Sequence, residues 1–434
     1  MEEKLSIIGS LRNEYGNMAR ELCEMISRLL FCFYIFQNET QKGWRAIMRR
    51  TFSHYLPVNL IFGTGKAEVL GEEAARYGKR VMVVTGRGST KKSGLLDRAK
   101  ALLEKEGLEV TVFDEAEPNP LASTAMRGAA IAREKGCDVV VGLGGGSIMD
   151  CSKAVAFSAC NEGPVFDYIY GTKKGSGALP LVLVPTTCGT GSEGNCFAVL
   201  TDDGTRDKKS LRDNAVIARA SIVDPELMTT MPARVLASVG YDALCHCMEA
   251  YMSKICDPIT EIMALEGIRL IGANLVKIYE EKKKGLTDLT VMDMDAWSAV
   301  CLASTYGGMV INQAGVTAPH GLEHPASGMR NITHGRGLAA LTPVIYRRTI
   351  EAAPEKFAVI SKCLGGRDEK DCVDVIEALL CRLDLRTTLS AEGVLAEDVE
   401  WMTKNAFKVS AAGLQNHPKV FTEEEVSRIY LEAL

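Results

Sequence analysis

The sequence predicts an α/β domain with a parallel sheet over residues 51–236, followed by an all-helical domain over residues 237–434. Two observations support this fold class. Between residues 78 and 184, apolar runs alternate with helical patterns, which is typical of βαβ units. From about residue 237 onward, apolar residues recur at intervals of three and four and no alternating runs return, which indicates helices.

The composition narrows the class of protein. With 47% hydrophobic and 24% charged residues, the chain has the profile of a soluble globular protein. Its net charge is −5, and it lacks a basic stripe interleaved with aromatic residues, so we exclude nucleic-acid binding. The 14 cysteines form no CxxC pair, and no secretory leader precedes them, so we expect reduced thiols and a cytoplasmic location.

Residues 1–50 differ from the rest of the chain. Their apolar run, LLFCFYIF at 29–36, is shorter than the roughly 18 residues of a membrane span, and acidic residues precede it. We therefore expect no membrane segment. Two interpretations remain open: one or two appended helices, or a natural translation start at Met48.

Four apolar runs predict the strands of the sheet. They occupy residues 78–86, 108–114, 139–142 and 179–184, and a helical pattern at 95–107 follows the first. Because ligands of such sheets bind at the carboxyl ends of the strands, the segments that follow these runs are candidate binding loops.

A glycine-rich turn follows the third run. Gly144, Gly145 and Gly146 allow a ligand to approach the backbone, and Ser147 is predicted as the N-cap of the next helix. The N–H groups and the dipole of a helix N-terminus favour an anion such as a pyrophosphate.

The loop after the first strand reads TGRGSTKKSG instead of GxGxxG, and no carboxylate ends the strand to bind an adenosine ribose. Small and cationic residues stand there, which favours a 2′-phosphate and therefore NADP(H) over NAD(H); they are Gly86, Arg87, Ser89 and Lys92. A solvated lysine pair at a helix start is the alternative interpretation. After the fourth strand, a loop rich in hydroxyl groups and glycine at 186–192 is expected to hold phosphates or ribose of the cofactor.

The helical half contains a predicted metal site. Asp242 and His246 are four residues apart, so they share a helix face, and His320 and His334 belong to a second histidine-rich run. Imidazoles with one carboxylate suit a divalent cation such as Fe²⁺ or Zn²⁺. Any one of these histidines taken alone is as readily interpreted as an ordinary core or surface residue.

Neighbouring residues of the predicted site have open or secondary roles. Cys245 and Cys247 adjoin His246 but cannot share its helix face, so a thiolate ligand is less favoured. Glu249 either orients an imidazole or forms a surface ion pair. His324 precedes Pro325, so the helix is predicted to end or kink there and His324 to point into the cleft without binding metal.

These motifs together carry a resemblance. GGGSIMDCSK, PTTCGTGSE, GYDALCHCMEAY and the histidine-rich run resemble the iron-containing alcohol dehydrogenases (group III), in particular their NADPH-dependent butanol dehydrogenase and aldehyde reductase branch, over Tyr55 to Leu434. The resemblance implies a Rossmann-like domain that binds the dinucleotide and a helical domain that binds Fe²⁺ or Zn²⁺. The implied roles are metal binding by Asp242, His246, His320 and His334; a position near the reacting carbon for His324; the pyrophosphate turn of Gly144 to Ser147 with Asp150; the hydroxyl loop of Thr186, Thr187 and Thr190; and the nicotinamide side for Lys208.

The implied activity is interconversion of primary alcohols and aldehydes similar to butanol and butanal. A divalent ion serves as Lewis acid for the charge that grows on oxygen, and His324 is the candidate for relaying the alcohol proton. We expect a homodimer.

Other functions remain as alternatives. They are a cyclase or lyase similar to the dehydroquinate synthases, a polyol oxidoreductase similar to glycerol dehydrogenase, and a cofactor-binding protein without activity. The cyclase would need several cations for its acidic substrate. Between residues 314 and 341 only Arg330 and Arg336 occur, which favours an uncharged substrate. A non-enzyme would have a broken ligand set, and here all four positions are filled.

Overall fold

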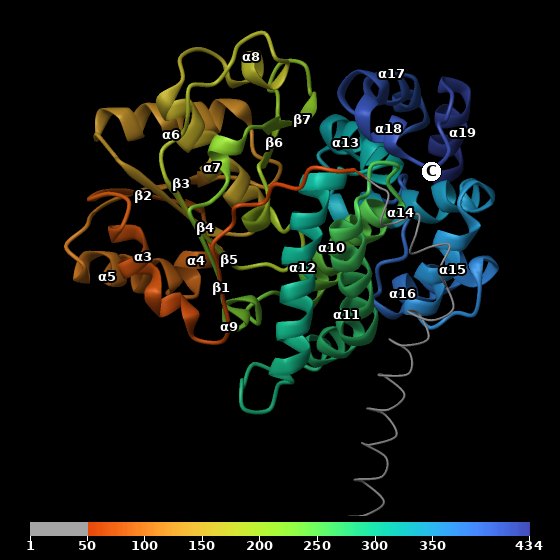
Figure 1. Ribbon diagram of the computed structural model, residues 1–434, viewed down its shortest axis with the longest axis horizontal. Coiled ribbons are helices and arrows are strands. Elements are labelled where there is room, and N and C mark those ends of the chain that lie inside the picture. The colour runs from red at the N-terminus through yellow and green to blue at the C-terminus, as the bar shows by residue number, and fades with distance from the viewer. Residues whose placement is uncertain (1–50) are drawn as a thin grey trace, which may run out of the picture. The chain divides into compact units, whose positions relative to one another are not determined.

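The computed structural model describes residues 51–434, so the predictions for residues 1–50 lie outside the described residues (Figure 1). From His54 to Leu434 the chain forms one compact unit. It begins with an α/β half and continues as a helical half, which confirms the predicted fold class. The strands are β1 (Leu60–Phe62), β2 (Arg80–Gly86), β3 (Glu109–Ala116), β4 (Val139–Gly144), β5 (Leu181–Pro185), β6 (Phe197–Thr201), β7 (Lys208–Arg212) and β8 (Ala220–Val223).

Six strands form one sheet in the order β1-β8-β5-β4-β2-β3, and every neighbouring pair is parallel. The four predicted strands are β2, β3, β4 and β5 of this sheet. The prediction missed β1 and β8, which are too short for a pattern of period two, and the separate antiparallel hairpin of β6 and β7. Since β5, β4 and β2 are adjacent, the loops that follow their carboxyl ends lie at one edge of the sheet.

Helices cover both faces of the sheet (Figure 1). Along β2, Val81 and Val83 pack with helices α3 (Leu70–Ala75) and α5 (Leu95–Lys105). The alternate residues Met82 and Val84 pack on the other face, with α6 (Ala122–Glu134) and α7 (Gly146–Cys160). Successive side chains of a strand point to opposite faces, so a continuous apolar run is what this two-sided burial requires. The shorter helices of this half are α4 (Ser89–Lys92), α8 (Val165–Ile169) and α9 (Pro225–Met228).

The helical half has its own apolar core around three long helices. The predicted domain boundary at residue 237 falls inside the first of them, α10, and the division into domains stays a prediction. The helices are α10 (Ala233–Met252), α11 (Pro258–Lys283), α12 (Met294–Ala314), α13 (Ala318–Arg330), α14 (His334–Arg347), α15 (Pro354–Cys363), α16 (Cys372–Arg382), α17 (Val399–Val409), α18 (Ala411–Asn416) and α19 (Glu423–Ala433).

Helix α13 does not end at Pro325, so that part of the prediction is wrong. A proline inside a helix removes only its own N–H bond and strains the preceding turn. Here Leu322 and Ala326, on either side of Pro325, are fully buried in the helical core. The free energy gained by burying these two side chains offsets the free-energy cost of Pro325, so the helix continues past it.

None of the helices in residues 51–434 has the length and apolar character that a membrane crossing requires. Every cysteine in the same residues is a free thiol.

Lys153 fixes the glycine-turn helix α7 to the segment between β5 and β6. Its side chain is fully buried, and its Nζ donates to the carbonyl oxygens of Ser192 (2.6 Å), Asn195 (2.9 Å) and Phe197 (2.7 Å) and to Oδ1 of Asn195 (2.9 Å). Burial lowers the pKa of Lys153 to about 8. The Lys153 ammonium is thus the shared hydrogen-bond donor of four buried oxygens, three of them backbone carbonyls and one the Asn195 side chain.

Replacing Lys153 by methionine is expected to destabilise the fold by about 3–5 kcal/mol, because it leaves those buried oxygens without a donor. Urea denaturation followed by circular dichroism measures the change. Lys105→Met, at an exposed lysine of α5, is the matched control and should stay close to the wild type. A Lys153→Met protein as stable as the control would contradict this role.

Candidate metal centre

Three helices supply the side chains of the predicted metal site. Helix α10 carries Asp242, His246 and Glu249 at spacings of four and three, which puts them on one face. Helix α13 carries His320 in its first turn, and His334 is the first residue of α14. The site is therefore assembled from the middle of one helix and the N-terminal ends of two others.

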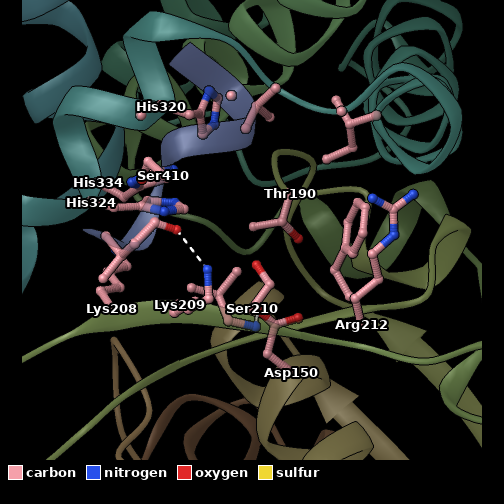
Figure 2. A pocket seen from close by; sticks show the side chains of 18 of the residues that line it. Asp150, Thr190, Lys208, Lys209, Ser210, Arg212, His320, His324, His334 and Ser410 are labelled. Atoms are coloured by element: carbon pink, nitrogen blue, oxygen red, sulfur yellow. Dashed lines mark hydrogen bonds between the residues drawn. The ribbon is translucent and has the colours of Figure 1, made fainter. Parts of the chain in front are cut away.

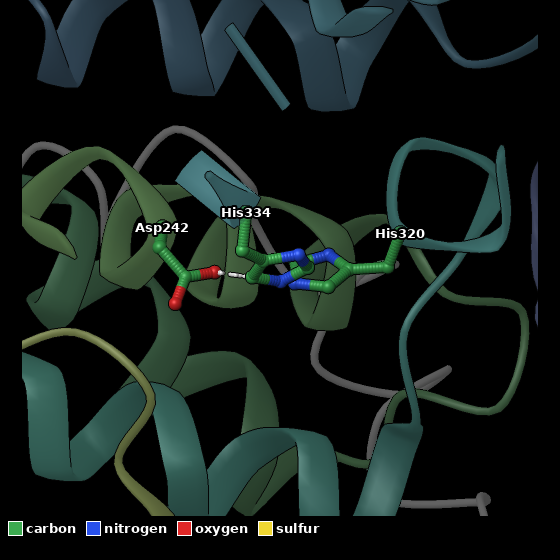
Figure 3. A group of neighbouring side chains, drawn as sticks. All are labelled: Asp242, His320 and His334. Carbon is green, nitrogen blue, oxygen red and sulfur yellow. Dashed lines mark hydrogen bonds and ion pairs between the residues drawn. The ribbon is translucent and has the colours of Figure 1, made fainter. Parts of the chain in front are cut away.

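Three imidazole nitrogens converge on one carboxylate oxygen. The Nε2 atoms of His320, His334 and His246 lie 3.3, 3.5 and 3.6 Å from Oδ1 of Asp242. Figure 3 shows Asp242, His320 and His334 turned toward one another, and their ligand atoms all lie within 4.8 Å of each other. The ring of His246 stacks on that of His320 with centroids 4.5 Å apart. Three nitrogens and one carboxylate oxygen with this spacing fit a single Fe²⁺ or Zn²⁺ ion.

Two further carboxylates hold the outer nitrogens of the imidazoles. Nδ1 of His320 lies 2.5 Å from Oε1 of Glu249, and Nδ1 of His334 is paired with Oε2 of Glu323. Both glutamates are fully buried. A carboxylate at Nδ1 keeps the proton on that nitrogen, so Nε2 turns its lone pair inward, which is the tautomer that a metal ligand needs. The surface ion pair considered for Glu249 is therefore wrong.

The charges of the site are strongly coupled. Burial alone would raise the pKa of Asp242, but the imidazoles of His246, His334 and His320 hold it below its ordinary value. Burial lowers the pKa of His246 to about 4. Burial also acts to lower the pKa of His320, yet Glu249 and Asp242 raise it to about 10. The two buried carboxylates therefore favour a positive charge beside them.

The two cysteines beside His246 point elsewhere. The Sγ atom of Cys245 lies 3.7 Å from Oγ1 of Thr342, and that of Cys247 lies 3.8 Å from the carbonyl oxygen of Ala303. Burial raises the pKa of the Cys247 thiol to about 12. Neither thiol is placed as a ligand of the site.

His324 lies beside the site on α13. Its ring centroid is 6.1 Å from that of His320 and 5.7 Å from that of His334. Burial, with a further contribution from the Lys208 ammonium, lowers the pKa of His324 well below its usual value. Ligand atoms of His324, Glu323 and His334 form a second group close enough for an ion. Glu323 of that group is already paired with Nδ1 of His334, so the first group fits an ion better.

The glycine turn packs directly against the hydroxyl loop. A Cβ at Gly146 would lie 2.1 Å from Cγ2 of Thr190, and one at Gly145 would lie 3.0 Å from Oγ1 of Thr187. Helix α7 begins at Gly146 with Gly145 as its N-cap, so the prediction of Ser147 as the cap is wrong. Because these glycines have no side chain, the start of the helix can lie close to the hydroxyl loop. The Ser147 hydroxyl accepts a hydrogen bond from the Asn119 backbone N–H at 3.3 Å.

Asp150 and Lys208 are buried side chains with partners of their own. Oδ1 of Asp150 accepts from the Ser192 hydroxyl at 2.6 Å, and its Oδ2 accepts from the Val199 N–H at 3.0 Å. Lys208 Nζ donates to Oδ1 of Asn119 at 3.0 Å. The bonds of Asp150 join helix α7 to Ser192 and to strand β6, so this carboxylate holds the helix that follows the glycine turn in place. A carboxylate would itself repel a pyrophosphate.

One cavity of about 420 Å³ extends from the glycine turn and the hydroxyl loop to the predicted metal site (Figure 2). Its wall includes Ser147 and Thr190 from the glycine turn and the hydroxyl loop, and Asp242, His320 and His334 from the metal site. His324 and Lys208 line the same cavity. The predicted metal site therefore opens into the space that the glycine turn borders.

Comparisons with known proteins agree with this arrangement. The family model described as iron-containing alcohol dehydrogenase matches residues 57–225, and the C-terminal model of the same family matches residues 236–434. The chain belongs to the iron-containing alcohol dehydrogenases. It is thus an NAD(P)-dependent alcohol dehydrogenase acting on alcohols and aldehydes, and its family implies a metal. The cyclase alternative is not favoured.

Individual relatives cover nearly the whole family region of this alcohol dehydrogenase. It is 32% identical to the 1,3-propanediol dehydrogenase of Klebsiella pneumoniae, over 88% of this chain and 99% of the relative. An archaeal alcohol dehydrogenase from a Red Sea brine pool superposes with a TM-score of 0.83 at 33% identity, over 89% of this chain and all of that one. The NADH-dependent butanol dehydrogenase A of Thermotoga maritima superposes with a TM-score of 0.79 at 28% identity, over 88% and 98%.

In this alcohol dehydrogenase the loop after β2 presents mixed charges. Arg87, Ser89 and Lys92 are exposed at the end of the strand, and Gly86 is half-buried. Lys91 pairs with Asp114 of the neighbouring strand β3, and this pairing lowers the pKa of Asp114. A carboxylate thus lies near the predicted phosphate site, although the end of β2 carries none. The alternative interpretation was that Lys91 and Lys92 are both simply solvated. It does not describe Lys91 fully, because Lys91 is paired with Asp114.

Sequence reasoning missed three partners in this alcohol dehydrogenase. Glu323, Asn119 and Ser192 touch His334, Lys208 and Asp150, respectively. The sequence signal for Glu323 was its place between His320 and His324 on one short helix. Asn119 and Ser192 are far in sequence from the residues that they contact, so only the fold reveals them.

Proposed function

We propose that this enzyme interconverts primary alcohols and aldehydes of about butanol size with NADP(H), and that Asp242, His246, His320 and His334 hold Fe²⁺ or Zn²⁺ for that reaction. The observation that carries the proposal is the convergence of three Nε2 atoms on Oδ1 of Asp242 at 3.3–3.6 Å, in the cavity that also borders the glycine turn. Relatives named for propanediol and butanol support short alcohols as substrates.

The chain's own residues then position and protonate the substrate. When bound, the ion supplies a Lewis acid and the dinucleotide supplies or accepts a hydride. Ser147 and the N-terminus of α7, with Thr190 opposite, offer donors to the phosphates of the dinucleotide. His324 lines the cavity next to His320 and His334, where its imidazole can take the alcohol proton during oxidation and return it during reduction.

NADP(H) is proposed over NAD(H) because no carboxylate ends β2 and because Arg87 and Lys92 are exposed there. The Lys91–Asp114 pair leaves these two cations to meet a 2′-phosphate. Relatives named as NADH- or NAD-dependent use the other cofactor, so kinetics with both cofactors test this preference. We also propose that the enzyme is a homodimer and is cytoplasmic.

Protein purified without oxygen, assayed for bound metal and then for oxidation of NADPH and NADH with butanal, tests the proposal. We expect one Fe²⁺ or Zn²⁺ per chain and a higher kcat/KM with NADPH. Protein without turnover when fully loaded with metal would refute the activity. Turnover with NADH but not NADPH would refute the cofactor preference alone.

Replacing Gly86 by aspartate is expected to reduce kcat/KM for NADPH roughly 10- to 100-fold relative to NADH, because the new carboxylate repels a 2′-phosphate. A Cβ at Gly86 meets the end of the Ile148 side chain at 3.2 Å, which can shift slightly. Gly86→Asn adds the same volume without the charge, so it should keep the wild-type cofactor ratio. Equal ratios in the two variants would place the 2′-phosphate elsewhere.

A further inference from the structure

Cationic side chains of strand β7 line the cavity in front of the metal site. Lys208, Lys209 and Arg212 all belong to this strand and to the cavity wall. In Figure 2, Arg212 lies on the side of the view opposite His324 and His334. The β6–β7 hairpin was not predicted from the sequence, and of these three cations only Lys208 was expected in the site, as a residue near the nicotinamide.

The three cations differ in how their charge is balanced. Lys208 Nζ lies 3.8 Å from Oε2 of the buried Glu323. Lys209 instead donates to the carbonyl oxygen of Val409 at 2.8 Å, and Arg212 donates to that of Asn312 at 3.1 Å. Carbonyl groups are neutral, and within residues 51–434 no carboxylate forms an ion pair with Lys209 or Arg212. Asp207 attracts the Lys209 ammonium, and Asp150 and Asp242 line the same cavity. Within residues 51–434, however, Arg212 forms no ion pair with any of these carboxylates.

Arg212 is held in place before any ligand binds. Its guanidinium lies over the ring of Phe197, 5.0 Å from the centroid, and Phe197 is its register partner across the hairpin. The bond to the Asn312 carbonyl fixes one end of the guanidinium against helix α12. A planar guanidinium has five N–H donors, and its fork matches a carboxylate. Since its orientation is already set, little freedom is lost when an anion binds.

We propose that the cavity takes alcohols and aldehydes that carry a carboxylate or a similar anion at the end far from the reacting carbon, with Arg212 as the anion-binding residue. This inference rests on the proposed function, because it names the substrate class of the same site. Lys209 adds positive charge to the same wall.

The expectation of an uncharged substrate came from the scarcity of cations between residues 314 and 341. Both cations of that segment are used elsewhere. Arg330 forms hydrogen bonds to Asp398 at 2.7 and 2.8 Å, and Arg336 donates to Glu392 at 2.7 Å. The cations that line the cavity come from the α/β half, so the scarcity of cations between residues 314 and 341 does not determine the charge of the substrate.

Steady-state kinetics of the metal-loaded enzyme with two four-carbon aldehydes tests the proposal. Butanal is neutral, whereas 4-oxobutanoate has a terminal carboxylate. We expect kcat/KM for 4-oxobutanoate to exceed that for butanal by about 10-fold or more in the wild type, as for a charge-assisted hydrogen bond. Arg212→Met should lower that ratio by about 10-fold or more, mainly through KM for 4-oxobutanoate, and Arg212→Lys should restore part of it.

Arg219→Met is the matched control, because Arg219 is exposed and lies outside the cavity. It should keep the wild-type ratio, and bound metal should be equal in all variants. A wild type that prefers butanal, or an Arg212→Met protein with an unchanged ratio, would overturn the inference while leaving the proposed function intact. If Arg212→Met changed only the KM for NADPH, Arg212 would be a cofactor-binding residue, and the inference would also be overturned. A metal-loaded wild type that turns over neither aldehyde would contradict the proposed function itself.

Discussion

His320→Ala is expected to lose bound metal and turnover together. His320 Nε2 lies 3.3 Å from Oδ1 of Asp242, the shortest of the three nitrogen distances to that atom, and Glu249 holds its ring from the other side. Removing the imidazole deletes one of the four predicted ligands and leaves Glu249 buried without it. We expect metal content near zero and a kcat/KM with butanal that is lower by about 10³-fold or more.

The matched control for His320→Ala is His324→Ala, four residues further along the same helix. If His324 relays a proton and binds no metal, its variant should keep full metal content. Its kcat should fall by about 10²- to 10⁴-fold, the usual contribution of a general acid or base. Elemental analysis of protein purified without oxygen measures the first quantity, and NADPH oxidation measures the second.

The outcomes separate the two histidines. A His320→Ala protein with a full complement of metal would remove His320 from the ligand set. A His324→Ala protein without metal would instead favour the second group of side chains, Glu323, His324 and His334. Urea denaturation of the metal-free variants and wild type shows whether either protein has simply failed to fold.

The metal site was predictable because its residues carry short-range signals. Asp242 and His246 are separated by one helical turn, and His320 and His334 stand in one histidine-rich run, so residue type and spacing together suggested a single ion. The structure brings these four side chains to one point, while their role as ligands stays a prediction. The partner of Glu249 was not predictable, because the packing of α13 on α10 decides that it holds His320.

The sheet was predictable to the extent that its strands are fully buried. Strands β2, β4 and β5 read as apolar runs because helices cover both of their faces. Strand β7, with the sequence KKSLR, pairs only with β6, and three of its five residues are cations. Such a segment has no apolar signal, which is why Lys209 and Arg212 of the cavity wall were missed, whereas the family resemblance pointed to Lys208.

The structure also explains why two local rules failed. Ser147 has the residue type of an N-cap, but Gly145 is the N-cap and the helix begins at Gly146, two residues earlier than a cap at Ser147 would place it. Pro325 is disfavoured in a helix, but the core around Leu322 and Ala326 holds the helix together. In both cases tertiary packing outweighed a preference of about 1–3 kcal/mol.

Asp242→Asn is the second change with a large expected effect. Three buried carboxylates surround the imidazoles, but Glu249 and Glu323 face Nδ1 atoms, whereas only Asp242 faces the Nε2 atoms. Asp242 therefore supplies the negative charge next to the predicted ion. A neutral amide of the same shape keeps the volume but removes that charge, so a divalent cation would meet three neutral imidazoles and an amide oxygen.

We expect Asp242→Asn to lose most of its bound metal and to reduce kcat/KM by about 10³-fold or more. Asp97→Asn, at an exposed aspartate of α5, is the control for the general effect of losing a carboxylate and should leave both quantities unchanged. Glu323→Gln provides the sharper comparison, because a carboxylate that only orients a histidine typically affects metal affinity 10- to 100-fold. If Glu323→Gln lost the metal while Asp242→Asn retained it, the ion would belong to the neighbouring group and the convergence on Asp242 would be an ion-pair cluster without a catalytic cation.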